Sequence, residues 1–121
     1  MIEMNWFLPT GGDSRDVLPD DSSINRAPSH AYLAQVARAC EELGFDALLT
    51  PCGTGCEDAW LATASLIALT SRIKFLVAFR PALLTPTLAA QMASTFQRMS
   101  NGRCLVNIVT GAEQAELARF G

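Results

Sequence analysis

Four short apolar runs alternate with helix-like segments along the chain, and this alternation limits the folds open to it. The runs span Met4–Thr10, Phe45–Thr50, Ile73–Phe79 and Cys104–Thr110. Strands that alternate with helices are typical of βαβ units and a parallel sheet. The last strands are almost continuously apolar, as parallel strands buried on both faces should be.

The segments between the runs carry helix signals. Ser29 can cap a first helix, and Gly44 is suited to end it. Apolar residues recur between them with the helical period, at Leu33, Val36, Ala37, Cys40 and Leu43. A second helix is expected over Asp58–Leu69.

Thr85-Pro86 supplies an N-cap and a proline at the first helical position of a third helix. We expect this helix to run to about Met99, where Ser100-Asn101-Gly102 stops it. A fourth helix begins at Glu113. Right-handed crossovers then give either a doubly wound sheet or the start of a (β/α)8 barrel.

Polar residues fall at the carboxyl end of each expected strand, at Thr10, Thr50, Arg80 and Thr110. Both architectures place their chemistry at this edge of the sheet. The sequence therefore predicts a ligand site there. The polar stretch from Gly11 to Pro28 reads as a long loop, and such loops are often functional lids.

Charge and hydropathy exclude several classes of partner. The net charge of −3 gives no electrostatic footprint for nucleic acid. No apolar run reaches the roughly 18 residues of a membrane span. The four cysteines are scattered rather than spaced as a disulfide framework, so we expect reduced thiols and a cytoplasmic protein.

The segment Cys52-Gly-Thr-Gly-Cys56 has three interpretations: a metal clip, a redox pair or the wall of a substrate site. Structural zinc needs four ligands, and no second pair is present, so we predict no metal site. The spacing also differs from the CxxC of thioredoxin-like sites. A dinucleotide or phosphate loop is not supported by Gly53 and Gly55 alone. His30 is the only histidine, and it starts a helix.

Several motifs occur in a characteristic order: "WFLPT", "CEDAW", "KFLVAFRP", "TPT", "RMSNGR" and "NIVTG". Together they resemble the amino-terminal third of the bacterial alkanesulfonate monooxygenases, which belong to the luciferase-like flavin enzymes. The resemblance covers the chain from Asn5 to about Leu117. It selects the (β/α)8 barrel, of which residues 1–121 would be the amino-terminal portion of one domain.

The resemblance also implies a reaction. The family uses reduced FMN and O2 to cleave the carbon–sulfur bond of an alkanesulfonate, giving an aldehyde and sulfite. A separate NAD(P)H:FMN reductase supplies the flavin, and we expect a homo-oligomer. Neither nucleic acid nor a membrane is expected as a partner.

The resemblance assigns roles to individual residues. Cys56 matches a cysteine that lines the family's flavin and substrate pocket, and it is the candidate catalytic residue. This match favours the site wall among the three interpretations of the cysteine pair. Glu57-Asp58 would begin the second helix, where carboxylates complement the dipole.

Cofactor contacts are implied for three further places. Trp6 and Phe7 match a flat apolar wall beside the isoalloxazine. Val77-Ala78 aligns with a bulge that carries a non-proline cis peptide under the flavin. Asn107 and Thr110 match residues whose amide and hydroxyl bond the ring or ribityl oxygens.

The chain departs from the family pattern in its loops and in its length. Gly11, Thr54 and Gly55 stand where relatives carry polar groups, which leaves the substrate open. A complete barrel takes about 250 residues, so the chain holds three and a half βα units of eight. We expect the 121-residue chain alone to be inactive. The alternative is a truncated, non-catalytic relative with a structural or weak flavin-binding role.

Overall fold

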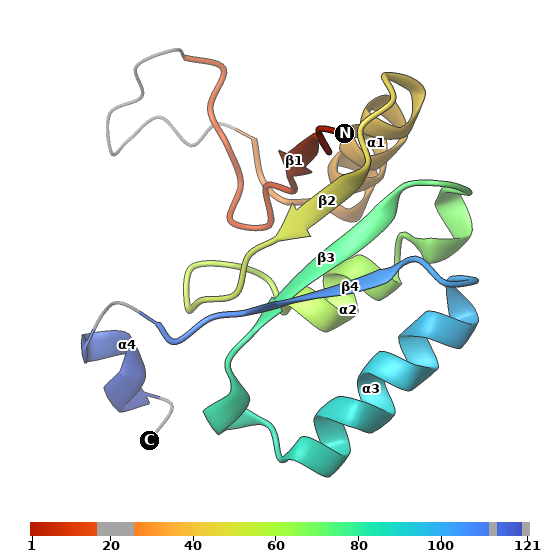
Figure 1. Cartoon of the computed structure of the whole chain (residues 1–121). Helices are drawn as coiled ribbons and strands as arrows, with labels where there is room; N and C mark the ends of the chain where they lie inside the picture. The colour runs from red at the N-terminus through yellow and green to blue at the C-terminus, as the bar shows by residue number, and fades with distance from the viewer. Residues whose placement is uncertain (17–25, 112–113, 120–121) are drawn as a thin grey trace.

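The computed structural model describes residues 1–16, 26–111 and 114–119. Its centre is a four-stranded parallel sheet in which every strand pairs with the next one in sequence (Figure 1). The strands are β1 (Asn5–Phe7), β2 (Ala47–Thr50), β3 (Lys74–Phe79) and β4 (Cys104–Ile108). The four expected parallel strands are confirmed, and their sequential order is that of a (β/α)8 barrel.

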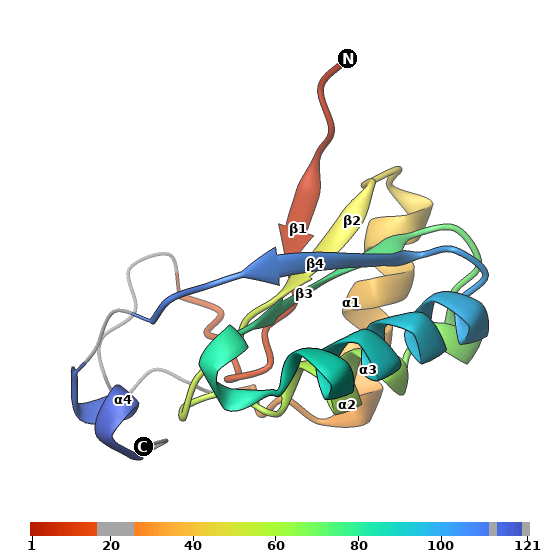
Figure 2. The same ribbon diagram turned by 60° about the horizontal axis from the view of Figure 1, so that its bottom comes forward.

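The helices are α1 (His30–Glu42), α2 (Ala59–Ala64), α3 (Pro86–Met99) and α4 (Gln114–Arg119), with 3-10 turns η1 (Ile67–Leu69) and η2 (Pro81–Leu83). Figures 1 and 2 show α1, α2 and α3 on one side of the sheet, and α4 beyond the carboxyl ends of the strands. A doubly wound sheet would carry helices on both faces. The described part is therefore the first part of a (β/α)8 barrel. None of its helices has the length and apolar character that a membrane crossing requires.

The predicted starts of α1 and α3 are confirmed, whereas the predicted start of the fourth helix, Glu113, lies outside the described residues. The Ser29 hydroxyl accepts a hydrogen bond from the Tyr32 N–H at 3.3 Å, and the Thr85 hydroxyl accepts one from the Leu88 N–H at 3.3 Å. Gly44, just past α1, has a φ of +83°, the left-handed conformation that ends many helices. These local signals fix where α1 and α3 lie along the chain.

One expectation about the helices is wrong. The second helix does not run to Leu69 but ends at Ala64, and η1 follows. Ser65 donates its hydroxyl hydrogen to the carbonyl of Ala62 at 2.7 Å, a local bond typical of a helix end. Leu43 shares the helical spacing of the buried residues of α1, but it is 77% exposed because it is the C-cap of this helix.

The sheet has two unlike faces. Residues in register point to the same side of a sheet, and successive residues alternate. Leu48 and Phe75 are paired, and both are fully buried under the helices, where Phe75 meets Phe96 of α3 with ring centroids 5.8 Å apart. The alternate row faces away from the helices, and it contains Phe7, Leu49, Leu76 and Leu105.

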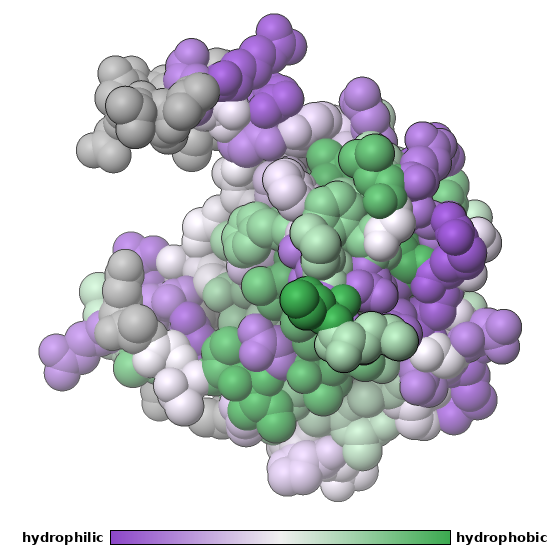
Figure 3. All heavy atoms as spheres, turned by 45° about the horizontal axis from the view of Figure 1, so that its top comes forward, coloured by the Kyte–Doolittle hydropathy of each residue, from purple (hydrophilic) through white to green (hydrophobic). Residues whose placement is uncertain are grey.

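Large hydrophobic side chains stay exposed on the outer strands β1 and β4, among them Phe7 at 52% and Leu105 at 37%. Figure 3 shows hydrophobic residues gathered over the middle of one face of the molecule. In a complete (β/α)8 barrel the sheet face away from the helices is the packed interior.

Candidate functional site

Two neighbouring cavities lie at the carboxyl ends of the strands. The first, which we call the α3 cavity, holds about 540 Å³ between the Cys52–Trp60 segment, the end of β3 and α3. The second, the β4 cavity, holds about 510 Å³ beside the segment Asn107–Gly111. Three residues line both cavities: Cys52, Ala78 and Arg80. The predicted position of a ligand site at this edge of the sheet agrees with these hollows.

An ion pair lies between the cavities. Arg80 Nη2 donates to Glu116 Oε2 at 2.6 Å, and the two side chains are only 8% and 13% exposed. The other carboxylate oxygen of Glu116 accepts a hydrogen bond from the backbone N–H of Thr54 at 2.7 Å. One carboxylate on α4 therefore joins the end of β3 to the loop after β2.

The pair also affects the ionisation of its members. The hydrogen bond to Glu116 raises the pKa of Arg80, and the same bond, helped by the Thr54 N–H, lowers the pKa of Glu116. Burial raises the pKa of the nearby Cys52 thiol, although the Arg80 charge opposes this effect. At neutral pH the site therefore holds a charged ion pair beside a protonated Cys52 thiol.

The loops after β1 and β2 lie against each other. The Glu57 N–H donates to the carbonyl of Thr10 at 3.0 Å. A Cβ on Gly11 would lie 2.9 Å from the carbonyl oxygen of Gly55 and 3.7 Å from Cys56 Sγ. A side chain at position 11 would therefore force the loops apart, and this contact explains why glycine stands here. The contact holds the Cys56 wall of the α3 cavity in place.

The four cysteines are all free thiols. Within the residues that the structure describes, no three metal-ligating side chains come together. Cys52 and Cys56 both line the α3 cavity, and Cys52 also reaches the β4 cavity. Their position agrees with the interpretation of the pair as a site wall.

The structure brings four of the predicted site residues together. Cys56 lines the α3 cavity, Asn107 and Thr110 line the β4 cavity, and Ala78 lines both. Ala78 and Asn107 are partners in the β3–β4 register, so they share the sheet face that points away from the helices. A small apolar residue thus lies beside an amide at the end of the sheet.

Three predicted residues lie elsewhere. Trp6 points toward the helices and meets Phe45 edge-on, with centroids 5.3 Å apart. Phe7 lies on the opposite face, half exposed, and lines neither cavity. Val77 is fully buried in the core under the helices.

The expected bulge at Val77-Ala78 is not present. Both residues pair regularly with β4, and the described residues contain no cis peptide bond. The regular register is sufficient to turn Ala78 toward the cavities and Val77 away from them.

Two further threonines of the predicted site edge are buried. Thr50 is fully buried, and its hydroxyl accepts a hydrogen bond from the Thr63 hydroxyl of α2 at 2.8 Å. The Thr10 hydroxyl is also buried, with no hydrogen-bond partner among the described residues. These side chains support the edge of the sheet and leave Thr110 as the exposed hydroxyl of the site.

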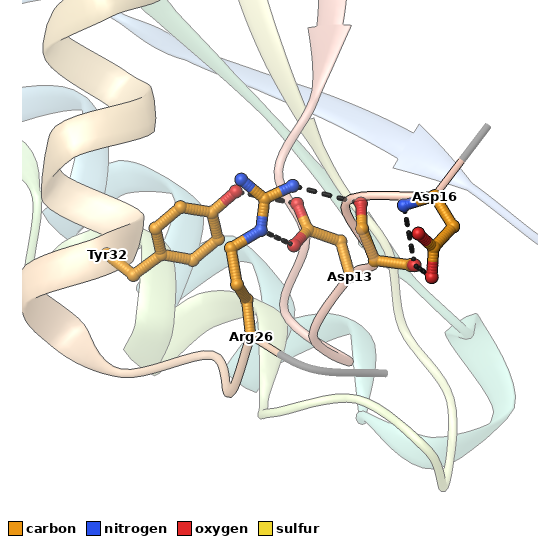
Figure 4. A network of polar contacts seen from close by, with 5 residues as sticks. Asp13, Asp16, Arg26 and Tyr32 are labelled. Atoms are coloured by element: carbon orange, nitrogen blue, oxygen red, sulfur yellow. Dashed lines mark hydrogen bonds and ion pairs between the residues drawn. The ribbon is translucent and has the colours of Figure 1, made fainter. Parts of the chain in front are cut away.

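The long loop after β1 is closed at its base, while its middle, residues 17–25, lies outside the described part. Asp13 and Arg26 form an antiparallel bridge and an ion pair of 2.6 Å. Tyr32 of α1 donates its hydroxyl hydrogen to Asp13 at 2.6 Å, as Figure 4 shows. Burial and this bond raise the pKa of Tyr32. The base of the loop is therefore fixed to α1.

Sequence reasoning missed Glu116 completely. Arg80 was expected at the edge of the sheet because it follows a strand, but its partner comes from a helix 36 residues further along. No local pattern links the two positions. The site therefore depends on a long-range contact that only the fold reveals.

Known proteins resemble this chain in both sequence and fold. The sequence profile of the luciferase-like monooxygenases matches residues 2–121. The structure of a long-chain alkane monooxygenase (LadA) aligns with a TM-score of 0.81 and 19% identity, over 99% of this chain and 33% of the other. The structure of EDTA monooxygenase (EmoA) from Chelativorans sp. BNC1 aligns with a TM-score of 0.80 and 18% identity, over 98% of this chain and 31% of the other.

A third structure is that of a riboflavin lyase (RcaE), determined with modified FMN and riboflavin. It aligns at 0.75 with 20% identity, over 99% of this chain and 33% of the other. The chain spans about a third of the length of these solved proteins. The structural likeness supports the fold, a luciferase-like (β/α)8 barrel over its first units.

Proposed function

Because the chain belongs to the luciferase-like monooxygenases, we propose that it is the amino-terminal part of an alkanesulfonate monooxygenase. The enzymes of this family depend on a flavin. The reaction would convert an alkanesulfonate, O2 and FMNH2 into an aldehyde, sulfite, FMN and water. One oxygen atom enters the aldehyde as the carbon–sulfur bond breaks, and the other leaves as water.

The observation that supports this proposal is the meeting of Cys56, Ala78, Asn107 and Thr110 around two adjoining cavities. Flavin rings have flat apolar faces and a polar edge. Leu49 and Ala78 offer apolar surface in the β4 cavity, and Asn107 and Thr110 offer an amide and a hydroxyl. The residues present therefore fit an isoalloxazine ring, with donors and acceptors at one edge only.

When bound, reduced FMN would supply the two electrons that the reaction needs. The residues of this chain would hold and orient it: Asn107 and Thr110 at the ring edge, Ala78 against its face, and Cys56 as the wall toward the substrate. Phe7 lies on the same sheet face and could extend the apolar surface. Trp6 and Val77 face the helices, so they would act by packing behind the site.

The remaining partners are also proposed. An NAD(P)H:FMN reductase would deliver the reduced flavin, and the protein would work in the cytoplasm as a homo-oligomer. Residues 1–121 would form the amino-terminal portion of a single (β/α)8 domain. The second candidate is a non-catalytic relative with a structural or weak flavin-binding role.

The test is release of sulfite from alkanesulfonates with reduced FMN and O2. We expect no sulfite above the flavin-only background from the 121-residue chain alone. The reason is that its sheet leaves strand edges and an apolar face exposed to water. Sulfite release by this chain would show that it completes its own site. Further βα units encoded in frame after Gly121 would favour the enzyme, and a stop codon the remnant.

In a protein that contains the whole barrel, Cys56→Ala should impair turnover or flavin affinity and leave the fold intact. Cys104→Ala is the matched control, because Cys104 is also a free, partly buried thiol but lines neither cavity. Equal activity in both variants would remove Cys56 from the proposed site.

A further inference from the structure

We propose that Arg80 recognises an oxyanion in the β4 cavity, and that Glu116 is an internal counter-ion which the oxyanion group of a ligand displaces. The inference rests on the proposed function for the source of that group, which would be the sulfonate of a substrate or the phosphate of the flavin. Its physical basis is independent of that function.

The first step is the distribution of charge. Arg80 is the one charged side chain among the described residues that line the β4 cavity. The other polar side chains of this cavity include Asn107 and Thr110, which are neutral. The α3 cavity also contains two carboxylates, Glu57 and Asp58. Asp58 caps α2 by accepting from the Leu61 N–H at 2.8 Å. An anion is therefore favoured on the β4 side.

The second step is the geometry of the guanidinium. Arginine presents a planar set of donors that matches the oxygens of carboxylates, sulfonates and phosphates. Arg80 already holds one oxyanion, the Glu116 carboxylate, at 2.6 Å. A site that binds an internal carboxylate this closely has the chemistry to bind the oxyanion group of a ligand.

The third step concerns space beside the guanidinium. Gly111 has a φ of +84°, and a Cβ there would lie 3.1 Å from Arg80 Nε and 3.2 Å from Arg80 Cζ. The missing side chain lets the backbone of this segment, which lines the β4 cavity, pass close to the guanidinium. The Arg80 side chain is therefore held against the segment that forms one wall of the β4 cavity.

The fourth step is energetic. A buried ion pair gains little net free energy, because desolvation nearly cancels the attraction, whereas a buried charge left alone is costly. Exchange of one oxyanion for another keeps Arg80 compensated throughout. Glu116 therefore compensates charge on Arg80 in the ligand-free state and competes with the ligand.

If Glu116 competes with the ligand, removing its charge should strengthen anion binding. If the ion pair only supports the structure, the same change should not strengthen it. Glu116→Gln keeps an oxygen for the Thr54 N–H but removes the charge that competes for Arg80. We expect methanesulfonate or inorganic phosphate to bind at least about tenfold more tightly to this variant, since charge-assisted bonds are the strong ones. A structural pair predicts the opposite, because loosening the loop would weaken binding.

The experiment is calorimetric titration of the protein with methanesulfonate and with inorganic phosphate at constant ionic strength. Arg80→Gln should abolish the binding, and Arg80→Lys, which keeps the charge without the planar fork, should weaken it. Glu57→Gln is the matched control and should change affinity little. Circular dichroism checks that each variant is folded, and if Arg80→Gln is not, Arg80→Lys and Glu116→Gln decide the outcome.

Titrations with FMN and riboflavin show whether the oxyanion that binds Arg80 is the flavin phosphate or a sulfonate. If it is the flavin phosphate, Glu116→Gln tightens FMN binding but not riboflavin binding. If it is a sulfonate, methanesulfonate binds more tightly while both flavins are unchanged. Unchanged or weaker binding of both anions to Glu116→Gln overturns the proposal. Anion binding without flavin binding would contradict the proposed function and leave this inference standing.

Discussion

The Glu41 carboxylate accepts a hydrogen bond of 2.8 Å from the backbone N–H of Ile73, at the start of β3. The same carboxylate also accepts bonds from the N–H groups of Ser71, at 3.0 and 3.1 Å, and Arg72, at 2.6 Å. Glu41 lies in the last turn of α1, so one side chain fixes this helix to the turn that leads into the central sheet. Burial tends to raise the pKa of Glu41, but the bonds from Ile73, Arg72 and Ser71 outweigh it and lower the pKa to about 2.

Glu41 should therefore contribute to stability against acid. Its pKa is below the ordinary value of 4.5 in the folded protein, so the unfolded chain binds the proton first. The contribution is complete above about pH 4.5 and is lost as the pH falls toward 2. Glu41→Gln should lower the free energy of unfolding at pH 7 and flatten its pH dependence in this window. Urea denaturation from pH 2.5 to 7 measures both.

The control for this prediction is Glu42→Gln, a neighbouring carboxylate that is exposed. It should retain the acid dependence of the unsubstituted protein. An equal slope of stability against pH in the Glu41→Gln protein would contradict the assigned role.

Gly111→Ala should destabilise the protein more than Gly44→Ala. Both glycines have left-handed backbones, with φ of +84° and +83°, and an alanine there costs roughly 1–2 kcal/mol. At Gly111 the new Cβ would also lie 3.1 Å from Leu117 Cδ2 and from Arg80 Nε, whereas at Gly44 nothing lies within 4 Å. Urea denaturation measures the free energy of unfolding of both variants, and the difference between them is the cost of the contacts at Gly111. An equal loss of stability in the two variants would show that the segment around Gly111 adapts.

The buried threonine pair should behave as a coupled unit. Thr50→Val or Thr63→Val alone leaves the other hydroxyl buried without its partner, which costs about 1–3 kcal/mol. The double variant should lose less than the two single losses together. A double-mutant cycle by chemical denaturation measures the coupling, with exposed Thr95→Val as control. Additive losses would mean that the hydroxyl bond contributes nothing.

All four cysteines should titrate as thiols in a reduced extract after denaturation. In the native protein Cys40 should react most slowly, because it is 5% exposed and burial raises its pKa. Cys40→Ala should remove only this slow phase. Fewer than four thiols in the denatured sample would indicate the Cys52–Cys56 disulfide that we do not expect.

Local signals were sufficient to predict the helix starts and the alternation of strands and helices. Ser29, Thr85 and Gly44 determine the helix ends through contacts with near neighbours, and sequence patterns record such contacts well. The parallel strands followed from apolar runs separated by helices, but these runs left their order open. The resemblance then selected the barrel, in agreement with helices on one face.

The site was predicted only in part, for two physical reasons. Adjacent residues of a strand point to opposite faces, so of Val77 and Ala78 only Ala78 reaches the cavities. Contacts between distant segments leave no local pattern, so the partners of Arg80 and of Arg103 were not foreseen. Arg103 comes from the "SNGR" motif and is buried, donating to the carbonyl of Ile67 at 2.8 Å.

The sequential order of the sheet also determines how the protein can form on the ribosome. Each strand after the first pairs with the strand made just before it. As the chain emerges, every new βα unit meets an edge that is already in place, and no strand must wait for a later segment to pair with the preceding one. Pairing with the preceding strand keeps each closed loop as short as one βα unit allows, which limits the entropy lost in closing it. The sheet can therefore grow from its amino-terminal end during translation, one unit at a time.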